Sequence, residues 1–280
     1  MIKILSYGGG LDSFGMLLDA IQRQELPQYA VFADTGSPAG RDGEWPGTYL
    51  HIRDYAIPLC QKYGIEFVWI TKDMYPVRGY DSLISFFEAN KMMLTRMSRV
   101  CTAAAKVERI DKWMADAIPA HEDTEVWIGF EAGEENRAAN DPHNSKTCGN
   151  GPRRTNRFPL MQGNFCRCRC ELLARKMGYP VPRKSACIYC PFNSKGDWKI
   201  AAAEQPVTFA RAVSLEDNSK LTEKRGIKLR FSGDEDKPLE EWIAEDYKAR
   251  LIPCAVCGRS PRASKKVGTG YLTPAEYVQE

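Results

Sequence analysis

The segment Ser6-Tyr7-Gly8-Gly9-Gly10-Leu11-Asp12-Ser13 joins an apolar run at residues 2–6 to a helical pattern. Glycines in a strand-to-helix turn let backbone N–H groups approach a ligand closely, and the first N–H groups of the helix favour a phosphate. Asp12 and Ser13 fall where the helix begins, so the serine hydroxyl is placed to bind a phosphate oxygen and the carboxylate to hold Mg²⁺. Both residue types are also common helix caps, so the turn alone leaves a phosphate site and a structural cap open.

The pattern around this turn predicts an α/β fold. Phe14, Leu17, Leu18 and Ile21 have the spacing of one helix face. Further helices are predicted near residues 49–63, with Pro58 as a kink or early end, and over 84–89 and 107–118. Short strands alternating with helices indicate a doubly wound, mostly parallel sheet with helices on both faces. The apolar runs that read as its strands are residues 2–6, 29–33, 66–70 and 125–129.

The second half of the chain has a different composition. Residues 141–157 are rich in Asn, Gly, Pro and Arg, which predicts a loop, and helices and cysteine clusters follow. We therefore expect a nucleotide-binding α/β domain over residues 1–150. Residues 151–280 would form a basic, cysteine-rich helical extension packed on it.

Composition and charge limit the class of protein. With 280 residues, 43% of them apolar and 10% aromatic, the chain is not expected to be disordered. It has no run of about 18 apolar residues and no apolar leader, so we expect a cytoplasmic protein without a membrane span. The net charge is only +3, but residues 153–199 hold eleven Lys and Arg against two acids. This excess favours a nucleic acid partner contacted by Arg153, Arg154 and Arg157, with a solvated basic face as the alternative.

Two familiar phosphate loops do not fit the glycine segment. A Walker loop needs a Lys-Ser/Thr pair after its last glycine, and the chain has none there. The dinucleotide fingerprint needs a third glycine where Ser13 stands.

The segment resembles instead the pyrophosphatase loop S-G-G-x-D-S of the adenine nucleotide alpha-hydrolase superfamily. Residues 9–13 match it, whereas Gly8 replaces the first serine and Ser6 lies two residues earlier. Over about residues 4–198 the chain resembles the phosphoadenylylsulfate (PAPS) reductase-like group, which includes the ATP pyrophosphatases of DNA phosphorothioation systems. The further matching segments are Ala33-Asp34-Thr35-Gly36 with Pro46-Gly47-Thr48-Tyr49, Arg99-Val100-Cys101-Thr102 with Lys106, Ile128-Gly129-Phe130-Glu131 with Glu134 and Arg137, and Ser185-Ala186-Cys187-Ile188-Tyr189-Cys190-Pro191-Phe192.

This resemblance implies an enzyme that binds ATP with Mg²⁺. It implies catalytic roles for Asp12, Ser13 and Arg137, and substrate contacts from Arg99, Lys106 and Glu134. The nucleotide would be held by Ser6, Gly8, Gly9, Gly10, Leu11, Asp12, Ser13, Asp34, Thr35 and Gly129.

Ten cysteines in a chain expected in a reducing compartment favour metal binding or chemistry over disulfides. Iron–sulfur members of the resembled group hold a [4Fe–4S] cluster with a mid-chain Cys-Cys pair and a later Cys-x-x-Cys. In this chain only one cysteine, Cys101, stands where the group has the mid-chain pair. We expect a cluster on Cys101, Cys187, Cys190 and Cys170, with Cys168 nearly as good as Cys170. The alternative is a zinc ribbon formed by Cys187, Cys190, Cys254 and Cys257.

The three histidines, His51, His121 and His143, lack metal-ligand spacing and are expected at the surface or in loops.

The function expected first is an ATP pyrophosphatase that adenylates a substrate, so that sulfur can displace the AMP. The resemblance makes DNA phosphorothioation the sharpest version, with thiolation of tRNA as its nearest relative and a cysteine desulfurase as sulfur donor. A reductase of adenylyl or phosphoadenylyl sulfate ranks lower, because no cysteine follows Cys257 in the tail. A non-enzymatic binding module that keeps a nucleotide fold is the third possibility.

Overall fold

The computed structural model describes residues 1–36, 42–96, 100–141, 146–219, 229–234, 236–246 and 254–259. Arg99, one of the expected substrate contacts, and His143 lie outside these ranges.

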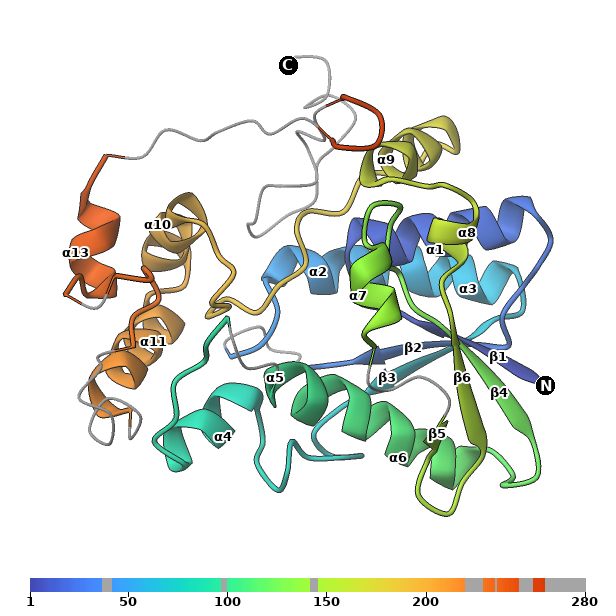
Figure 1. The fold of residues 1–280 in the computed structure, drawn as a ribbon, viewed down its shortest axis with the longest axis horizontal. Coiled ribbons are helices and arrows are strands. Elements are labelled where there is room, and N and C mark those ends of the chain that lie inside the picture. Colours follow the sequence, from blue (N-terminus) through green and yellow to red (C-terminus); the bar gives the residue numbers. More distant parts are fainter. Residues whose placement is uncertain are drawn as a thin grey trace.

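A six-stranded sheet in the order β3-β2-β1-β4-β6-β5 forms the centre of the fold (Figure 1). All neighbouring strands are parallel except β5, which pairs antiparallel with β6. The predicted α/β class is therefore confirmed. The strands are β1 (Ile2–Ser6), β2 (Tyr29–Ala33), β3 (Glu66–Ile70), β4 (Asp123–Trp127), β5 (Lys146–Thr147) and β6 (Arg153–Arg157).

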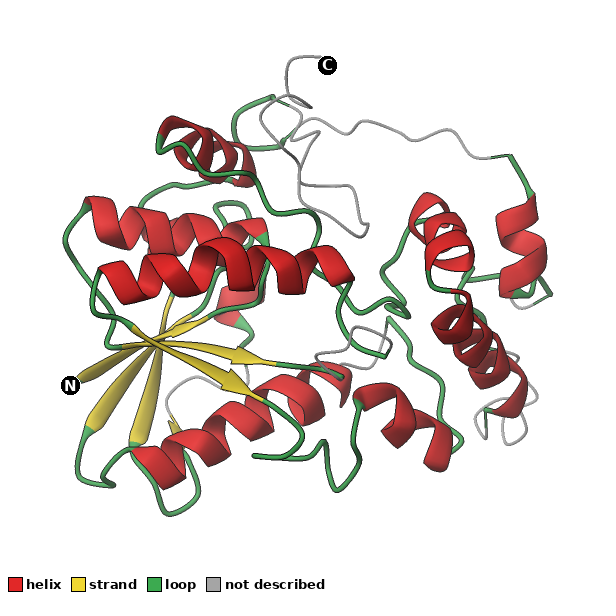
Figure 2. Ribbon diagram, turned by 180° about the vertical axis from the view of Figure 1, so that it is seen from behind, coloured by secondary structure: helices red, strands yellow, loops and turns green. Residues whose placement is uncertain are grey.

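Helices cover both faces of the sheet (Figure 2). The apolar face of α1 is buried against β1, β2 and α9, as the spacing of its apolar residues predicts. On the opposite face, Ile110, Trp113 and Met114 of α6 pack on side chains of β1 to β4. The first face carries α1 (Leu11–Gln22), α2 (Pro46–His51), the π-helix η1 (Ile52–Ala56), α3 (Ile57–Lys62), α8 (Pro159–Gln162) and α9 (Arg167–Lys176); the second carries α5 (Val100–Thr102), the π-helix η2 (Ala103–Val107) and α6 (Glu108–Ala117).

Pro58 does not end the helix that contains it. It lies in the first turn of α3, directly after the π-helical turn η1, where its missing N–H is tolerated.

A second, all-helical group lies beside the carboxyl edge of the sheet. It surrounds Trp198, which is fully buried, and it also takes in Ile188 and Tyr189 of the Cys-x-x-Cys segment. None of the described helices has the length and apolar character needed to cross a membrane. The group consists of α4 (Leu83–Ala89), α10 (Lys195–Glu204), α11 (Pro206–Asn218) and α13 (Leu239–Ala244).

The expected loop over residues 141–157 is wrong, because this segment contains β5 and β6. Buried and exposed residues alternate along β6, but the buried ones are Arg154 and Asn156, so no apolar alternation marks the strand in the sequence. The sheet thus continues past residue 150, where the expected boundary of the first domain lies. The fourth strand also begins two residues earlier than predicted, at Asp123.

The strand order places a switch point between β1 and β4. From β1 the chain moves to β2 on one side, whereas β4 and β6 lie on the other side. In open α/β sheets the crevice at the carboxyl ends of two such strands is where ligands bind. The glycine segment follows β1, and residues 128–137 follow β4, so both are at this crevice.

Candidate active site

A cavity of about 570 Å³ opens at the switch point between β1 and β4. Its walls come from the glycine segment, the loop after β4, α5 with Lys106 of η2, and the segment 184–192. Motif segments that are far apart in the sequence therefore meet at one site. The expected residues that line it are Ser6, Gly8, Gly10, Asp12, Ser13, Thr35, Lys106, Gly129, Arg137, Cys101, Cys187 and Cys190.

The glycine segment is shaped by close packing. Gly9 has a φ of +73°, and a Cβ at this position would lie 2.4 Å from Thr48 Cγ2. Any larger residue would therefore be strained and would collide with α2. Leu11 is fully buried under the segment, so Gly9 and Leu11 shape the turn while Gly8 and Gly10 face the cavity.

Asp12 stands in the first turn of α1 and lines the cavity. Its Oδ2 accepts a hydrogen bond from Arg167 Nη1 at 3.1 Å, whereas its Oδ1 is buried with no hydrogen-bond partner among the described residues. Burial raises the pKa of Asp12, and Arg167 opposes this shift. A buried carboxylate oxygen without a partner needs one, and Mg²⁺ prefers oxygen ligands. Asp12 therefore fits a bound magnesium ion.

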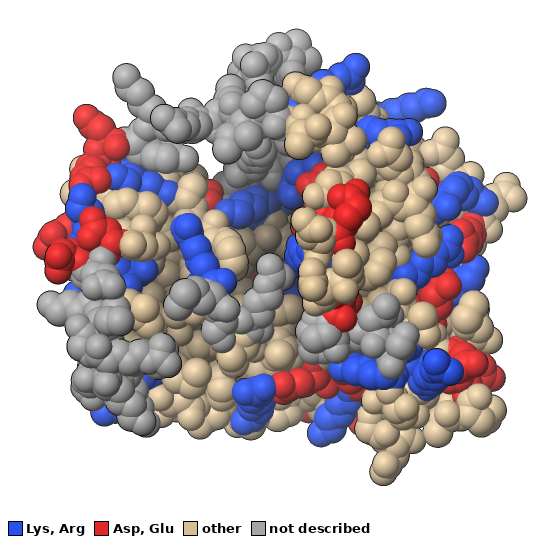
Figure 3. Space-filling view, in the orientation of Figure 1, with Lys and Arg blue, Asp and Glu red and all other residues tan. Residues whose placement is uncertain are grey.

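Four cationic side chains line the cavity, against the two carboxylates of Asp12 and Glu44. Figure 3 shows Lys and Arg side chains in and around a hollow in the middle of this face. Such a cationic excess in a recess favours a polyanionic ligand. The four cations are Lys106, Arg137, Arg167 and Lys184.

Lys106 is held by a buried partner. Its Nζ lies 3.1 Å from Glu44 Oε1, and Glu44 is 0% exposed. Burial alone would lower the pKa of Lys106, but Glu44 and Cys187 beside it keep the pKa above its usual value. Lys106 is therefore a permanent positive charge in the wall of the cavity.

Arg137 is positioned by Glu134. The Glu134 carboxylate accepts hydrogen bonds from Arg137 Nη1 at 2.8 Å and from the backbone N–H of Glu131 at 3.0 Å. The Arg137 guanidinium also lies 4.1 Å from the centre of the Phe130 ring. Glu134, expected as a substrate contact, thus orients Arg137 and does not line the cavity itself. Gly129 lies against the start of α1, where a Cβ would be 3.4 Å from the Ser13 nitrogen.

Asp34, expected to contact the nucleotide, is committed to internal hydrogen bonds. It accepts them from the Gly36 N–H at 3.0 Å, from Tyr49 Oη at 2.7 Å and from Trp69 Nε1 at 3.1 Å. It is 1% exposed and does not line the cavity, whereas its neighbour Thr35 does. Asp34 therefore shapes the turn after β2.

The arginines expected to contact nucleic acid lie on β6 and differ in burial and in their ion-pair partners. Arg154 is 3% exposed and pairs with Asp111 at 2.8 Å. Arg157 pairs with Glu25 and Glu125. Arg153 alone of the three is exposed. Two of the three side chains are thus paired with carboxylates of the fold, and the contact of all three with a nucleic acid stays a prediction.

Three of the four expected cluster ligands meet at the cavity, but the fourth does not. Cys101, Cys187 and Cys190 line it, and burial raises the pKa of Cys190 to about 11. Cys170 is buried against α1, where a Cβ added at Gly15 would lie 2.6 Å from its Sγ. The side chain of Cys170 therefore fills the contact between α1 and α9, which explains why it is not part of the group at the cavity.

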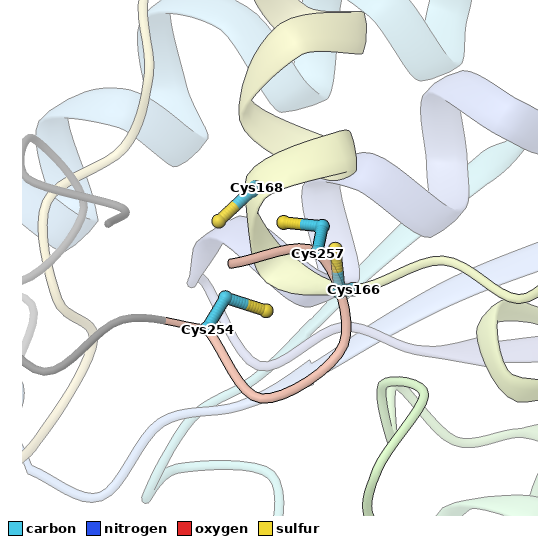
Figure 4. Close-up of side chains that lie close together, drawn as sticks. All are labelled: Cys166, Cys168, Cys254 and Cys257. Atoms are coloured by element: carbon cyan, nitrogen blue, oxygen red, sulfur yellow. The ribbon is translucent and has the colours of Figure 1, made fainter. Parts of the chain in front are cut away.

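A different set of four cysteines comes together beside α9 (Figure 4). The sulfur atoms of Cys166, Cys168, Cys254 and Cys257 all lie within 4.8 Å of one another. Within the described residues this is the one such group of cysteines, histidines or carboxylates. It corrects the zinc ribbon expected as the alternative, since Cys254 and Cys257 join Cys166 and Cys168 and not Cys187 and Cys190.

Three further residues line the cavity that had no role at the nucleotide site expected from the sequence: Arg167, Lys184 and Ser185. Ser185 Oγ donates a hydrogen bond to the Gly8 carbonyl at 2.5 Å. Arg167 and Lys184 belong to the basic segment 153–199, and Ser185 stands two residues before Cys187. His51, expected at the surface, is fully buried, and its ring Nε2 lies 3.1 Å from the Pro180 carbonyl oxygen.

Comparisons with known proteins add a likeness of fold. No protein-family model matches the chain, and no curated protein does. Among solved structures, the U34-tRNA thiolase NcsA from Methanococcus maripaludis with its [4Fe-4S] cluster is similar over 92% of this chain and 77% of that chain. The sequence identity is 16% and the TM-score 0.40. A likeness at this level does not assign an activity, a substrate or a cluster to the present chain.

Proposed function

We propose that the chain is an ATP pyrophosphatase that transfers AMP to a substrate and so prepares it for sulfur insertion. The observation that carries the proposal is the cavity itself. The glycine segment, the start of α1 and four cationic side chains surround one space, and Asp12, whose Oδ1 has no partner among the described residues, lines it. This arrangement suits a triphosphate with its magnesium ion.

The proposed reaction is an attack by a substrate oxygen on the α-phosphorus of ATP. A bond forms between that oxygen and phosphorus, the bond to the β-phosphate bridging oxygen breaks, and pyrophosphate leaves. Negative charge grows on the departing pyrophosphate, where preorganised cations have the largest effect. We assign this role to Lys106 and Arg137, assign Asp12 to Mg²⁺, and assign the backbone N–H groups of residues 8–13 to the phosphates.

Sulfur chemistry is proposed for the same cavity. Cys101, Cys187 and Cys190 line it. Three cysteine thiols at one cavity suit the ligation of a [4Fe–4S] cluster, and these residues would hold it. A bound cluster would supply iron to bind the incoming sulfur. The resemblance of the sequence makes a cysteine desulfurase the proposed source of that sulfur.

For the acceptor we propose a nucleic acid, with DNA ahead of tRNA on the resemblance of the sequence. Two aromatic residues, Phe130 and Phe192, line the cavity, and Phe192 is 52% exposed with Arg96 6.0 Å from its ring centre. Exposed aromatic rings beside arginine are platforms on which unpaired bases stack. The reductase alternative ranks lower, because Cys257 belongs to the four-cysteine group.

The test is adenylation of an acceptor. Full-length protein is incubated with Mg²⁺ and ATP labelled at the α-phosphate, together with duplex DNA, single-stranded DNA, tRNA or no acceptor. The proposal predicts label on a nucleic acid and release of unlabelled pyrophosphate. Release of labelled AMP only, at a rate that no nucleic acid changes, would contradict the proposed acceptor but not ATP cleavage.

A further inference from the structure

The four-cysteine group brings together two segments that lie far apart in the sequence. Cys166 is the residue before α9, and Cys168 is in its first turn. Cys254 and Cys257 lie on one turn, residues 254–259, which Figure 1 draws beside α9. Figure 4 shows the sulfur atoms of the two segments directed toward a common space.

The geometry points to a single Zn²⁺ ion held by Cys166, Cys168, Cys254 and Cys257. A tetrahedral ion with zinc–sulfur bonds of about 2.3 Å places its ligand sulfurs about 3.8 Å apart. The four sulfur atoms lie within 4.8 Å of one another, so small movements of the side chains bring them to this arrangement. A [4Fe–4S] cluster attaches its thiolates to four separate irons, so it requires a wider frame than this group provides.

The turn that carries Cys254 and Cys257 is built as a metal-binding knuckle. The Gly258 N–H donates to the Cys254 carbonyl at 2.8 Å, and the Cys254 N–H donates to the Arg259 carbonyl at 2.6 Å. Gly258 has a φ of +72°, which a glycine adopts without strain. The tight turn brings both sulfurs to one side, as a two-residue spacing between ligands requires.

The start of α9 supports the first pair of ligands. The Arg169 N–H donates to the Cys166 carbonyl at 2.9 Å. A hydrogen bond of this kind fixes the backbone that carries a metal ligand. Cys166 also lies at the N-terminus of the ten-residue helix α9, where negative charge is favoured.

The zinc ion would fix two parts of the cavity wall. Arg167 stands between two ligands, reaches Asp12 with its guanidinium, and donates its backbone N–H to the Glu131 carboxylate. The knuckle also contacts the loop after β4, since a Cβ at Gly133 would lie 3.4 Å from Val256 Cγ2. That loop leads to Arg137. The ion is therefore structural, and its effect on the cavity is to hold Arg167 and the loop of Arg137 in place.

Metal analysis of the full-length protein, purified without oxygen and without added metal, tests the inference. The expected result is about one zinc per chain at this site, lost at least tenfold in Cys254→Ser and in Cys257→Ser. Cys148→Ser is the control, because Cys148 lies outside the four-cysteine group and its hydrogen bond to Asp111 suits a hydroxyl. This control is expected to keep the full zinc content.

A second measurement uses the wild-type protein and so does not depend on whether the variants fold. Zinc is removed from the wild-type protein with a chelator, and Co²⁺ is added as a spectroscopic probe of tetrahedral thiolate ligation. Amide exchange over residues 131–137 and 166–170 is expected to rise at least tenfold on removal and to return with Zn²⁺. Iron with acid-labile sulfide lost in Cys254→Ser, or a metal-free protein with these four cysteines in disulfides, would overturn the inference. None of these readouts requires ATP turnover, so they stay valid if the proposed function fails.

Discussion

Arg167 and Asp12 meet in the wall of the cavity, with Arg167 Nη1 3.1 Å from Asp12 Oδ2, although 155 residues separate them in the sequence. This ion pair links the first turn of α1 to the first turn of α9. One carboxylate oxygen is thereby neutralised and oriented, while Oδ1 stays unpartnered among the described residues. The pair thus holds the Asp12 carboxylate in one orientation at the wall of the cavity.

Replacing Asp12 by Asn is expected to lower pyrophosphate release at least a hundredfold. Asn keeps the size of the side chain but loses the charge that holds Mg²⁺, and losing such an electrostatic contact commonly costs about 3 kcal/mol in the transition state. The measurement is the initial rate of pyrophosphate release at saturating ATP. Asp54→Asn, on the outside of the π-helix η1, is the control and should keep the wild-type rate. A wild-type rate in Asp12→Asn would remove Asp12 from the proposed machinery.

Replacing Arg167 by Met is expected to shift the pH dependence of the reaction. Arg167 lowers the pKa of Asp12 against the raising effect of burial. Without it the pKa of Asp12 rises further, so a higher pH is needed to ionise the carboxylate. The acidic limb of the rate profile should move to higher pH, and Arg167→Lys should restore it in part. An unchanged acidic limb, with a rate reduced equally at every pH, would show that Arg167 does not act through Asp12.

Arg153 and Arg154 make a matched pair on β6. Arg154→Ala leaves the Asp111 carboxylate without its buried partner and should lower the free energy of unfolding by about 3 kcal/mol. Arg153→Ala removes an exposed side chain and should change it by less than about 0.5 kcal/mol. Denaturant unfolding of the two variants checks both values. Equal stability of the two variants would mean that the Arg154–Asp111 pair contributes nothing.

Arg153 and Arg157, on the same strand, test nucleic acid binding. If Arg153 contacts a phosphate, Arg153→Ala should reduce the slope of log affinity against log salt by about 0.7 to 0.9. Arg157→Ala should leave that slope unchanged, because Arg157 is engaged with Glu25 and Glu125. A larger change for Arg157 than for Arg153 would restore the surface first expected from the sequence.

His51 should make the fold sensitive to acid. Burial lowers its pKa to about 4, from about 6.5 when unfolded. Between these values the unfolded chain binds more protons at this position, so its contribution to stability is lost as the pH falls from about 6.5 to 4. The shift corresponds to about 3 kcal/mol. His51→Gln keeps a donor for the Pro180 carbonyl but cannot titrate, so the stability difference from wild type should change by about this amount between pH 7 and pH 4. If the difference in unfolding free energy between His51→Gln and wild type is the same at pH 7 and pH 4, the lowered pKa of His51 is contradicted.

Local sequence patterns predicted the elements whose conformation is determined by residues close to one another in the sequence. The glycine segment and α1 followed from φ requirements and from apolar spacing within about twenty residues. β6 was missed because its buried positions carry Arg154 and Asn156, whose burial is compensated by Asp111 and Asp141 from elsewhere in the chain.

The grouping of the cysteines could likewise not be predicted from the sequence, because it depends on contacts between residues far apart in the chain. Spacing identified Cys254 and Cys257 as a pair, but it gave no information on which other cysteines they meet. Cys166 and Cys170 lie one helical turn apart on α9, yet Cys170 is directed to Gly15 of α1 while Cys166 joins the four-cysteine group. Only the packing of α9 on α1 distinguishes them.

Identifying the products of ATP cleavage tests whether the chain cleaves ATP between its α- and β-phosphates. Full-length protein with Mg²⁺ and ATP labelled separately at the α- and γ-phosphates is followed by chromatography. The account predicts that the α label leaves as AMP or on an acceptor, and that the γ label leaves as pyrophosphate. Formation of ADP with the γ label in orthophosphate, or no binding of ATP to the wild-type protein, would contradict it.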